Sequence, residues 1–368
     1  MAYLSNAREC EEWQRMLPTT DASARALAPA DSRRRTADLI FRGALAFNGA
    51  LTLFWLVTFL TGGSFFFKDY TVNWELASRI LSGVLFFYVI WGVIWWAVKT
   101  ALLRWFVGFS KEERRDAFSS RMDRPYDVAD LVRRHSERRI RITDMIGRRG
   151  RFITLAAAGF YYLYVQVAQQ QNPNFATAFF QENLLDGVVT SWIFLGFYRV
   201  SNLLGAFFYG AQSRVMDGVL ARANCLLIST LWTGFKFVMV PIGAHLAGVF
   251  SKEEFAPVFA LIWGSYLVTD TSAEVFGSLL GKQRIRVWGI GDVNRKSVTG
   301  IVAGFASALI FCVWVVTAHG LGTPWLLLSV VLAASNTLLE LYSPRGTDDF
   351  TMATTNALLC WGFGAWLR

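Results

Sequence analysis

The chain has 368 residues, of which 54% are apolar and 15% aromatic, with 15 tryptophans and a formal net charge of +9. Apolar residues this frequent, gathered into blocks, exclude an ordinary soluble domain and are typical of a chain that crosses a membrane several times. The basic residues lie beside these blocks, which favours membrane topology over nucleic-acid binding as the cause of an isoelectric point near 9.6. We therefore expect membrane lipids as surroundings and no nucleic-acid partner.

The chain opens with a polar segment, residues 1–42, that lacks the apolar stretch of a signal peptide. Arg33, Arg34 and Arg35 stand shortly before the first apolar run, as basic residues often do on the cytoplasmic side of a membrane. Residues 1–38 are polar and rich in alanine, which predicts a poorly ordered tail.

Nine apolar runs follow this tail, and most are near the roughly 20 residues that a helix needs to cross a bilayer. The third and the sixth run are short and could be re-entrant or tilted. We therefore predict an all-α, polytopic integral membrane protein with seven to nine transmembrane helices. The runs cover about 43–63, 80–103, 152–168, 187–210, 223–249, 255–269, 298–318, 325–342 and 350–367.

The placement of lysine and arginine predicts the orientation of these spans. With the N-terminus in the cytoplasm, the segments on that side hold 29 of the 36 Lys and Arg residues, and the segments on the other side hold four. This orientation places two polar loops, 270–297 and 343–349, on the cytoplasmic face with the N-terminus. Nucleotides are found on that face, and two distant loops there could build one site.

Residues 104–151 form the largest polar segment after the tail, with 14 Lys and Arg against eight Asp and Glu. Two interpretations stay open: a basic amphipathic helix that lies on anionic lipid, or a solvated helical hairpin whose arginines only set the topology. Between the arginines, apolar residues recur at roughly helical spacing: Val128, Leu131, Val132, Ile142, Met145 and Ile146.

These features divide the chain into four parts. A polar tail precedes a first transmembrane hairpin, a basic cytoplasmic segment, and a transmembrane catalytic-like domain that carries the two motif loops. The parts cover 1–42, 43–103, 104–151 and 152–368.

Two carboxylates, Asp270 and Glu274, stand where the sixth apolar run ends. They are one helical turn apart, so a helix that enters the cytoplasm would aim both at one place. Carboxylates at a membrane boundary are costly unless they are paired or bind a cation, which makes them candidates for function. The alternative is a helix end that merely reaches water.

Small and basic residues follow these carboxylates: Gly277, Gly281, Lys282, Arg295, Lys296 and Ser297. Glycines let a backbone approach phosphate closely, and lysine and arginine neutralise its charge. Residues 295–297 directly precede the next apolar run, so their N–H groups would lie at a helix N-terminus, where anions bind. Close helix packing and ordinary topology-setting cations are the competing explanations.

The second loop begins after Glu340 and carries Asp348 and Asp349 behind a turn formed at Pro344 and Gly346. The two adjacent acids could share a metal with Asp270. The alternative is a solvated loop.

Cations also occur inside the apolar runs. Arg199 and Lys236 lie in mid-span, so we expect each to have a partner such as Glu340 or a bound phosphate. Lys99 lies near a span end, where its side chain could reach the interface.

The four cysteines, Cys10, Cys225, Cys312 and Cys360, are far apart, and three of them lie in apolar runs. This spacing predicts small buried side chains and neither disulfides nor a zinc site.

At these residues the chain resembles the membrane-embedded polyprenol kinases: phytol and farnesol kinases, dolichol kinase and, more remotely, phosphatidate cytidylyltransferase. The ordered series covers about residues 255–367, and the first 220 residues show no such match. The motifs read Asp270-Thr-Ser-Ala-Glu274, Gly277, Gly281-Lys282, Lys296-Ser-Val-Thr-Gly300, and Glu340-Leu-Tyr-Ser-Pro344 with Asp348-Asp349. Three positions depart from the family pattern: Thr299 stands where dolichol-kinase-like proteins carry Glu, Asp349 replaces Asn, and Ala353 replaces Pro.

The resemblance implies a kinase that uses CTP and Mg²⁺ to phosphorylate a long-chain isoprenoid alcohol. On this hypothesis Asp270 and Asp348 hold Mg²⁺ against the triphosphate, while Glu274 or Asp349 orients the alcohol or accepts its proton. Lys282, Arg295 and Lys296 neutralise the phosphates, with Gly277, Gly281 and Ser297 in the nucleotide-binding segment.

Two other functions stay open. The same site could transfer a nucleotidyl group from CTP to a lipid phosphate, which would release pyrophosphate. The substitutions at Asp349 and Ala353 instead suit a non-catalytic binding or transport protein on the same scaffold, with residues 104–151 as a docking surface.

Overall fold

The computed structural model describes residues 30–60, 92–118, 126–150, 213–289, 291 and 293–368, with isolated positions 75, 78, 82, 90, 153, 188, 191, 192 and 195. Helix accounts for 83% of the described residues and strand for 4%, which confirms the predicted all-α class. Three helical stretches are long and apolar enough to cross a membrane, as in a membrane protein: Arg35–Phe54, Val298–Ala318 and Thr323–Tyr342. The total of seven to nine spans stays a prediction, because the predicted runs 152–168 and 187–210 lie almost wholly outside the described residues.

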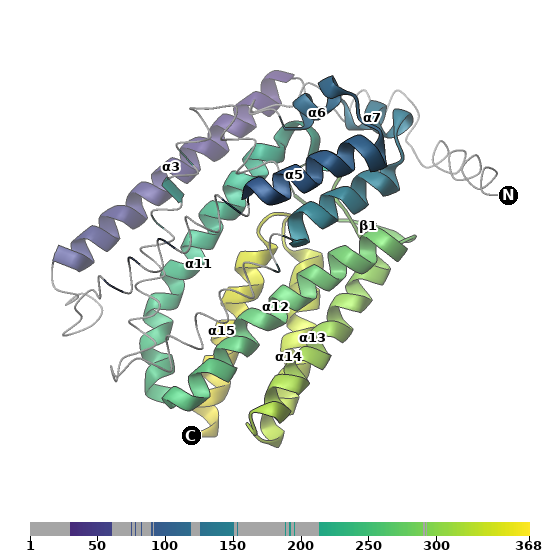
Figure 1. The fold of residues 1–368 in the computed structure, drawn as a ribbon. Helices are drawn as coiled ribbons and strands as arrows, with labels where there is room; N and C mark the ends of the chain where they lie inside the picture. Colours follow the sequence, from purple (N-terminus) through teal and green to yellow (C-terminus); the bar gives the residue numbers. More distant parts are fainter. Residues whose placement is uncertain are drawn as a thin grey trace.

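Five long helices form the C-terminal bundle (Figure 1). They are α11 (Ala221–Val249), α12 (Lys252–Leu280), α13 (Val298–Ala318), α14 (Thr323–Tyr342) and α15 (Asp348–Leu367). Their core is apolar and aromatic, with α12 at its centre through Phe255, Leu261 and Tyr266. The last three helices begin and end within two residues of the predicted runs, because apolar runs flanked by Gly, Pro and polar residues mark helix ends.

Small residues allow α12 and α13 to pack closely. A Cβ atom added at Gly300 would lie 2.4 Å from the backbone oxygen of Ala273, and one at Gly304 would lie 3.1 Å from that of Thr269. Only glycine fits at the first of these positions, and the close approach aligns the C-terminal end of α12 with the N-terminal end of α13.

Helix α12 is 29 residues long, so it extends beyond the short sixth apolar run, 255–269, at both ends. It begins at a capping box, in which Ser251 and Glu254 satisfy each other's backbone N–H groups. It continues through Asp270 and Glu274 to Leu280, because only one face of this last stretch has to be apolar. The first motif loop therefore begins at Gly281 instead of at residue 270.

The loop after α12 is a short hairpin in which β1 (Arg284–Arg286) pairs antiparallel with β2 (Arg295–Ser297). A single parallel bridge joins Gly289 to Arg345 in the second motif loop. The Arg345 N–H donates to the Trp288 carbonyl at 2.7 Å, so the two motif loops are tied together through their backbones.

The N-terminal part lies against this bundle. Helix α3 (Ala30–Leu60) packs on α11. Residues 30–38, which were predicted to be poorly ordered, are therefore helical, and the rest of the predicted tail, residues 1–29, lies outside the described residues. Further along the chain come α5 (Gly92–Leu102), the π-helix η2 (Leu103–Val107), α6 (Lys111–Ala117), α7 (Val128–Arg134), a helix of residues 137–150, and the 3-10 helix η3 (Val215–Leu220).

Residues 104–150 thus form several short helices instead of one amphipathic helix. Several of their apolar residues face the protein, since Leu131 and Ile140 are fully buried in a core with Val215, whereas Trp105 and Phe106 are exposed. A single basic amphipathic helix is therefore wrong for the described residues of this segment, because they form separate short helices. The solvated helical hairpin stays a prediction.

Candidate functional site

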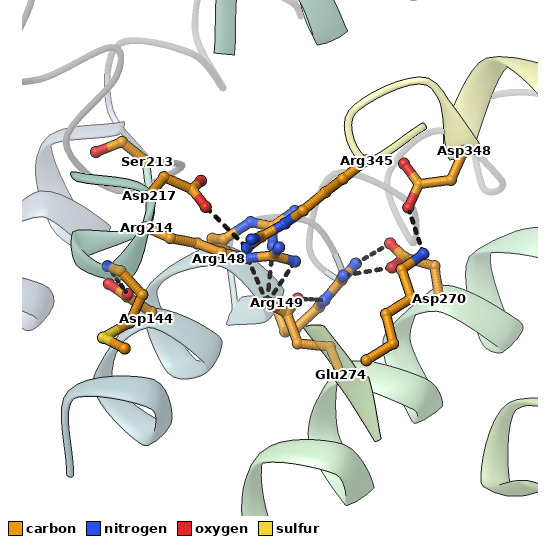
Figure 2. Close-up of polar contacts among 12 residues, drawn as sticks. Asp144, Arg148, Arg149, Ser213, Arg214, Asp217, Asp270, Glu274, Arg345 and Asp348 are labelled. Carbon is orange, nitrogen blue, oxygen red and sulfur yellow. Dashed lines mark hydrogen bonds and ion pairs between the residues drawn. The ribbon is translucent and has the colours of Figure 1, made fainter. Parts of the chain in front are cut away.

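Charged side chains from several separate segments of the chain meet at one end of the bundle (Figure 2). The C-terminal ends of α12 and α14 and the N-terminal ends of α13 and α15 lie together there, as the antiparallel order of the helices requires. The helix of residues 137–150 and the start of η3 cover this end with arginines. These long-range contacts bring together residues that are more than 100 positions apart.

Arg149 binds both carboxylates of α12. Its Nη2 donates to Asp270 Oδ1 at 2.7 Å, its Nη1 binds the other oxygen of Asp270, and its Nε binds Glu274. One guanidinium can span both acids because they are one turn apart on the same helix face. Burial would lower the pKa of Arg149, but Asp270 and Glu274 outweigh burial and raise it, so this side chain is always charged.

Glu274 is shared by three arginines. Besides Arg149, Arg148 Nη1 donates to Glu274 Oε1 at 2.7 Å, and Arg214 Nη2 lies 3.0 Å from the same oxygen. Burial alone would raise the pKa of Glu274, but the three guanidinium groups hold it far below its ordinary value. Both carboxylate oxygens are therefore occupied by cations, which makes Glu274 a poor proton acceptor.

Lys296 of β2 holds the second acidic group. Its Nζ lies 2.8 Å from Glu340 Oε1 and 3.1 Å from Asp348 Oδ2, and it also donates to the Glu340 carbonyl. Burial would raise the pKa of Asp348, but Lys296 outweighs burial and lowers that pKa to about 2. The partner of Glu340 is thus Lys296, whereas the side chains of Arg199 and Lys236 lie outside the described part of the structure.

Asp349 has the opposite environment. Burial, together with the negative charges of Asp270 and Asp348, raises the pKa of Asp349 to about 8. Its side chain is partly buried and lies beside a small cavity. Near neutral pH this carboxyl therefore holds a proton that an ordinary aspartate would have lost.

Arg345 comes from the second motif loop and pairs with Asp217 at 2.8 Å. Burial, with Asp217 opposing it and Arg214 and Arg148 adding to it, lowers the pKa of Arg345 to about 10. Gly346 follows with φ of +97°, and a Cβ atom there would lie 2.3 Å from Asn224 Oδ1, so the turn that presents Arg345 requires glycine.

A second ion pair positions Arg214. Lys99 is fully buried and lies 3.0 Å from Asp144, so the expectation that it reaches the membrane interface is wrong. Asp144 accepts from the N–H groups of Val215 at 2.7 Å and Met216 at 3.4 Å, and Lys99 donates to the Ser213 carbonyl. The backbone on both sides of Arg214 is thereby fixed.

Two cavities adjoin this cluster. The larger, of about 110 Å³, is lined by Arg141, Arg214, Arg295, Lys296 and Arg345 on its basic side. Its acidic side is formed by Asp144, Asp270, Glu274, Glu340 and Asp348. The smaller, of about 20 Å³, lies between Arg148, Arg214, Arg345 and Asp349. Arg214 and Arg345 line both cavities.

The predicted nucleotide-binding residues divide into two groups. Gly277, Arg295, Lys296 and Ser297 line the larger cavity, whereas Gly281 and the exposed Lys282 line neither of the two cavities. Gly277 and Gly281 make room for Ser297, because Cβ atoms there would lie 2.6 Å from its Oγ and 2.5 Å from its Cβ. Ser297 in turn caps α13 by accepting from the Gly300 N–H at 3.0 Å.

The residues expected to bind Mg²⁺ do not form a metal site in this arrangement. Arg149 binds both oxygens of Asp270, and Lys296 binds Asp348. Within the described ranges no group of three or more His, Cys, Asp or Glu side chains is arranged to hold a metal ion. The cations nearest these carboxylates are the protein's own.

Four functional candidates did not emerge from the sequence: Arg148, Arg149, Arg214 and Asp217. Arg148 and Arg149 lie among 14 basic residues of one segment, and no local pattern separates them from arginines that only set topology. Arg345 lies in the second predicted motif loop, 343–349, but it was not singled out from the sequence, because its role depends on the distant Asp217.

The fold and the site together define a helical protein of membrane type with a buried, highly charged site at one end of its bundle. No protein-family model matches the chain, and comparisons with curated proteins and with solved structures find no match.

Proposed function

We propose that the protein transfers the γ-phosphate of a nucleoside triphosphate, CTP by the resemblance, to an isoprenoid alcohol at the cytoplasmic face of a membrane. One observation carries the proposal: the separate motifs at Asp270–Glu274, Lys296 and Arg345–Asp348 meet around one cavity where the apolar helices end. Phosphoryl transfer needs clustered cations for the phosphates and carboxylates for the acceptor, at a place that a lipid tail can reach.

The environment of each carboxylate supports a division of roles. Glu274 is held by three arginines, so we assign it to positioning those arginines. Asp349 lies beside Asp270 and Asp348 and next to the smaller cavity, and its raised pKa makes its ionised form a stronger base than an ordinary aspartate. We therefore assign the ionised form of Asp349 as the acceptor of the alcohol proton. Of the two candidates for the proton acceptor, Glu274 and Asp349, we therefore choose Asp349.

The proposed reaction is an in-line displacement. The alcohol oxygen forms a bond to the γ-phosphorus, the bond from that phosphorus to the β–γ bridging oxygen breaks, and the alcohol proton passes to the ionised carboxylate of Asp349, which has first released its own proton to solvent. Lys296 and Arg295 would neutralise charge on the transferred group, and most of the rate enhancement would come from positioning and from these cations.

Magnesium remains an implication of the resemblance. Because Asp270 and Asp348 are held by Arg149 and Lys296, they do not fit a magnesium site as they stand, and no step is assigned to the ion.

The test is phosphate transfer by the purified protein in detergent with γ-labelled CTP or ATP, Mg²⁺, and a panel of farnesol, geranylgeraniol, phytol and longer polyprenols. We expect label in an organic-soluble monophosphate and its loss in Asp349→Asn. Glu254→Gln is the matched control, because Glu254 pairs with Arg368 at the other end of the bundle. Release of pyrophosphate in the presence of a lipid phosphate would replace the kinase by a nucleotidyltransferase. A folded protein that neither turns over nor binds nucleotide would indicate a non-catalytic scaffold.

A further inference from the structure

The arginines of the site come mostly from the half of the chain that carries no motif. Arg148 and Arg149 belong to the helix of residues 137–150, and Arg214 precedes η3. With Arg345 they place four guanidinium groups against three carboxylates: Asp217, Asp270 and Glu274. Within these direct ion pairs the guanidinium groups outnumber the carboxylates by one, while the lining of the larger cavity as a whole holds five basic and five acidic side chains.

The guanidinium groups are also close enough to repel one another. Arg214 and Arg148 both disfavour the charged form of Arg345, whose side chain is 9% exposed. The charged form of Arg141 is disfavoured in the same way. Burial and the positive charges of Arg284 and Arg345 lower its pKa to about 10, although Glu137 acts in the opposite direction. A bound anion between these groups would relieve the repulsion.

The arginines are held in place before any ligand arrives. The Lys99–Asp144 pair fixes the backbone around Arg214, and Arg345 is held by its backbone bond to Trp288 and by donation to the Val293 carbonyl. Pre-ordered donors lose little entropy when a ligand binds.

The larger cavity lies next to these donors. Arg141, Arg214 and Arg345 line it, and the buried Nε of Arg141 has no hydrogen-bond partner among the described residues. Its volume of about 110 Å³ is room for several water molecules, at roughly 10–15 Å³ each, or for the five heavy atoms of a phosphate group. A whole nucleotide does not fit in it. Guanidinium groups match phosphate oxygens in shape as well as charge.

We propose that Arg141, Arg214 and Arg345 form a phosphate-binding site that receives a terminal phosphoryl group in the larger cavity. This inference deepens the proposed function and rests on it for the source of the phosphate, which is either the nucleotide or a lipid monophosphate. Residues 104–150 are then part of the binding machinery, and their arginines do more than set topology.

The experiment measures binding, not turnover. The full-length protein in detergent is titrated by calorimetry with inorganic phosphate, tripolyphosphate, CTP and farnesyl monophosphate. We expect Arg214→Gln and Arg345→Gln to lose at least tenfold in affinity for every phosphate compound that the unsubstituted protein binds. Arg115→Gln is the matched control, because Arg115 is 79% exposed and lies outside the cluster. Tighter binding of CTP and tripolyphosphate identifies the nucleotide as the source, and tighter binding of farnesyl monophosphate identifies the lipid.

Unchanged affinity in folded Arg214→Gln and Arg345→Gln would overturn the inference. If either variant fails to fold, Arg214→Lys and Arg345→Lys take its place, because they keep the charge but lose the two-pronged geometry, and we expect an intermediate loss. The failure of the two proposals is distinguishable. Phosphate binding that depends on the arginines, without transfer to any alcohol, retains the site and refutes the kinase. Phosphate transfer to an alcohol that is unchanged in the Arg214 and Arg345 variants retains the kinase and refutes the phosphate-binding site.

Discussion

Replacing Glu274 by glutamine tests the central contact of the arginine cluster. The substitution keeps the size of the side chain but removes the charge that Arg148, Arg149 and Arg214 share. Loss of one partner from a buried ion pair costs about 3–5 kcal/mol, because the remaining charges stay buried. Glu274 is 10% exposed, so we expect the lower end of that range, about 3 kcal/mol.

The assay is thermal unfolding of the purified protein in detergent near neutral pH. At about 2–4 °C per kcal/mol the expected fall in Tm is roughly 6–12 °C. Because the arginines hold the pKa of Glu274 below its ordinary value, its contribution is fully present above about pH 5 and is lost only as the solution becomes more acidic. The gap between the two proteins should therefore stay constant from about pH 6 to pH 8.

Two comparisons make this prediction refutable. Glu254→Gln, the same substitution at an exposed ion pair with Arg368, should change stability by less than about 1 kcal/mol. Inorganic phosphate should raise the Tm of Glu274→Gln more than that of the unsubstituted protein, since an anion would replace the lost charge. A Glu274→Gln protein as stable as the parent would refute the argument that three guanidinium groups depend on this carboxylate.

Three further predictions concern the surroundings of the site. Asp349→Asn should stabilise the protein in EDTA by about 1–3 kcal/mol more near pH 8 than near pH 5.5. The raised pKa of Asp349 makes the native protein hold a proton that the unfolded chain releases above the ordinary pKa of 3.8. The stability of the unsubstituted protein therefore falls as the pH rises toward 8. Asp348→Asn should instead destabilise equally at both values, because the pKa of Asp348 is lowered, and Tm values at the two pH values separate these outcomes. Gly300→Ala should lower the free energy of unfolding in denaturant by about 1–3 kcal/mol, since the added Cβ would lie 2.4 Å from a backbone oxygen. Gly43→Ala is the control: nothing lies within 4 Å of its added Cβ, so it should be neutral or stabilising. Lys99→Met should lower the Tm, because it leaves Asp144 buried without its cation. Adding Asp144→Asn to Lys99→Met should recover part of the lost Tm. If the two substitutions lowered the Tm independently and additively, they would contradict a direct ion pair.

The helices of the bundle were predictable because burial in a bilayer or a core requires long apolar runs, and these runs end at recognisable breakers. The prediction stopped α12 at residue 269, where polar residues begin, although a helix continues as long as one face stays covered. The acidic half of the site, Asp270 with Asp348, was predictable for a related reason: carboxylates beside apolar runs are costly and therefore conspicuous.

The basic half was not predictable. Arg149 meets Asp270 across 121 positions, and Lys99 meets Asp144 across most of the basic segment. A charge beside an apolar run looks the same in sequence whether it faces lipid head groups or a buried acid. Only the fold shows that these particular arginines and this lysine point inward.

The contact of Ser297 with Gly277 and Gly281 has a mechanical consequence. The hydroxyl caps α13 while the side chain fits against two glycines of α12, so the seam between these helices has no spare space. Lys296 therefore cannot shift relative to Asp270 without breaking the cap. The opposite wall, made by residues 137–150 and Arg214, meets α12 in this region through side-chain ion pairs and a bond from Arg138 to the Leu279 carbonyl. The cavity can therefore widen to admit a molecule as large as a nucleotide only along that wall, where ion pairs can exchange partners. The contact between α12 and α13 stays fixed on the other side.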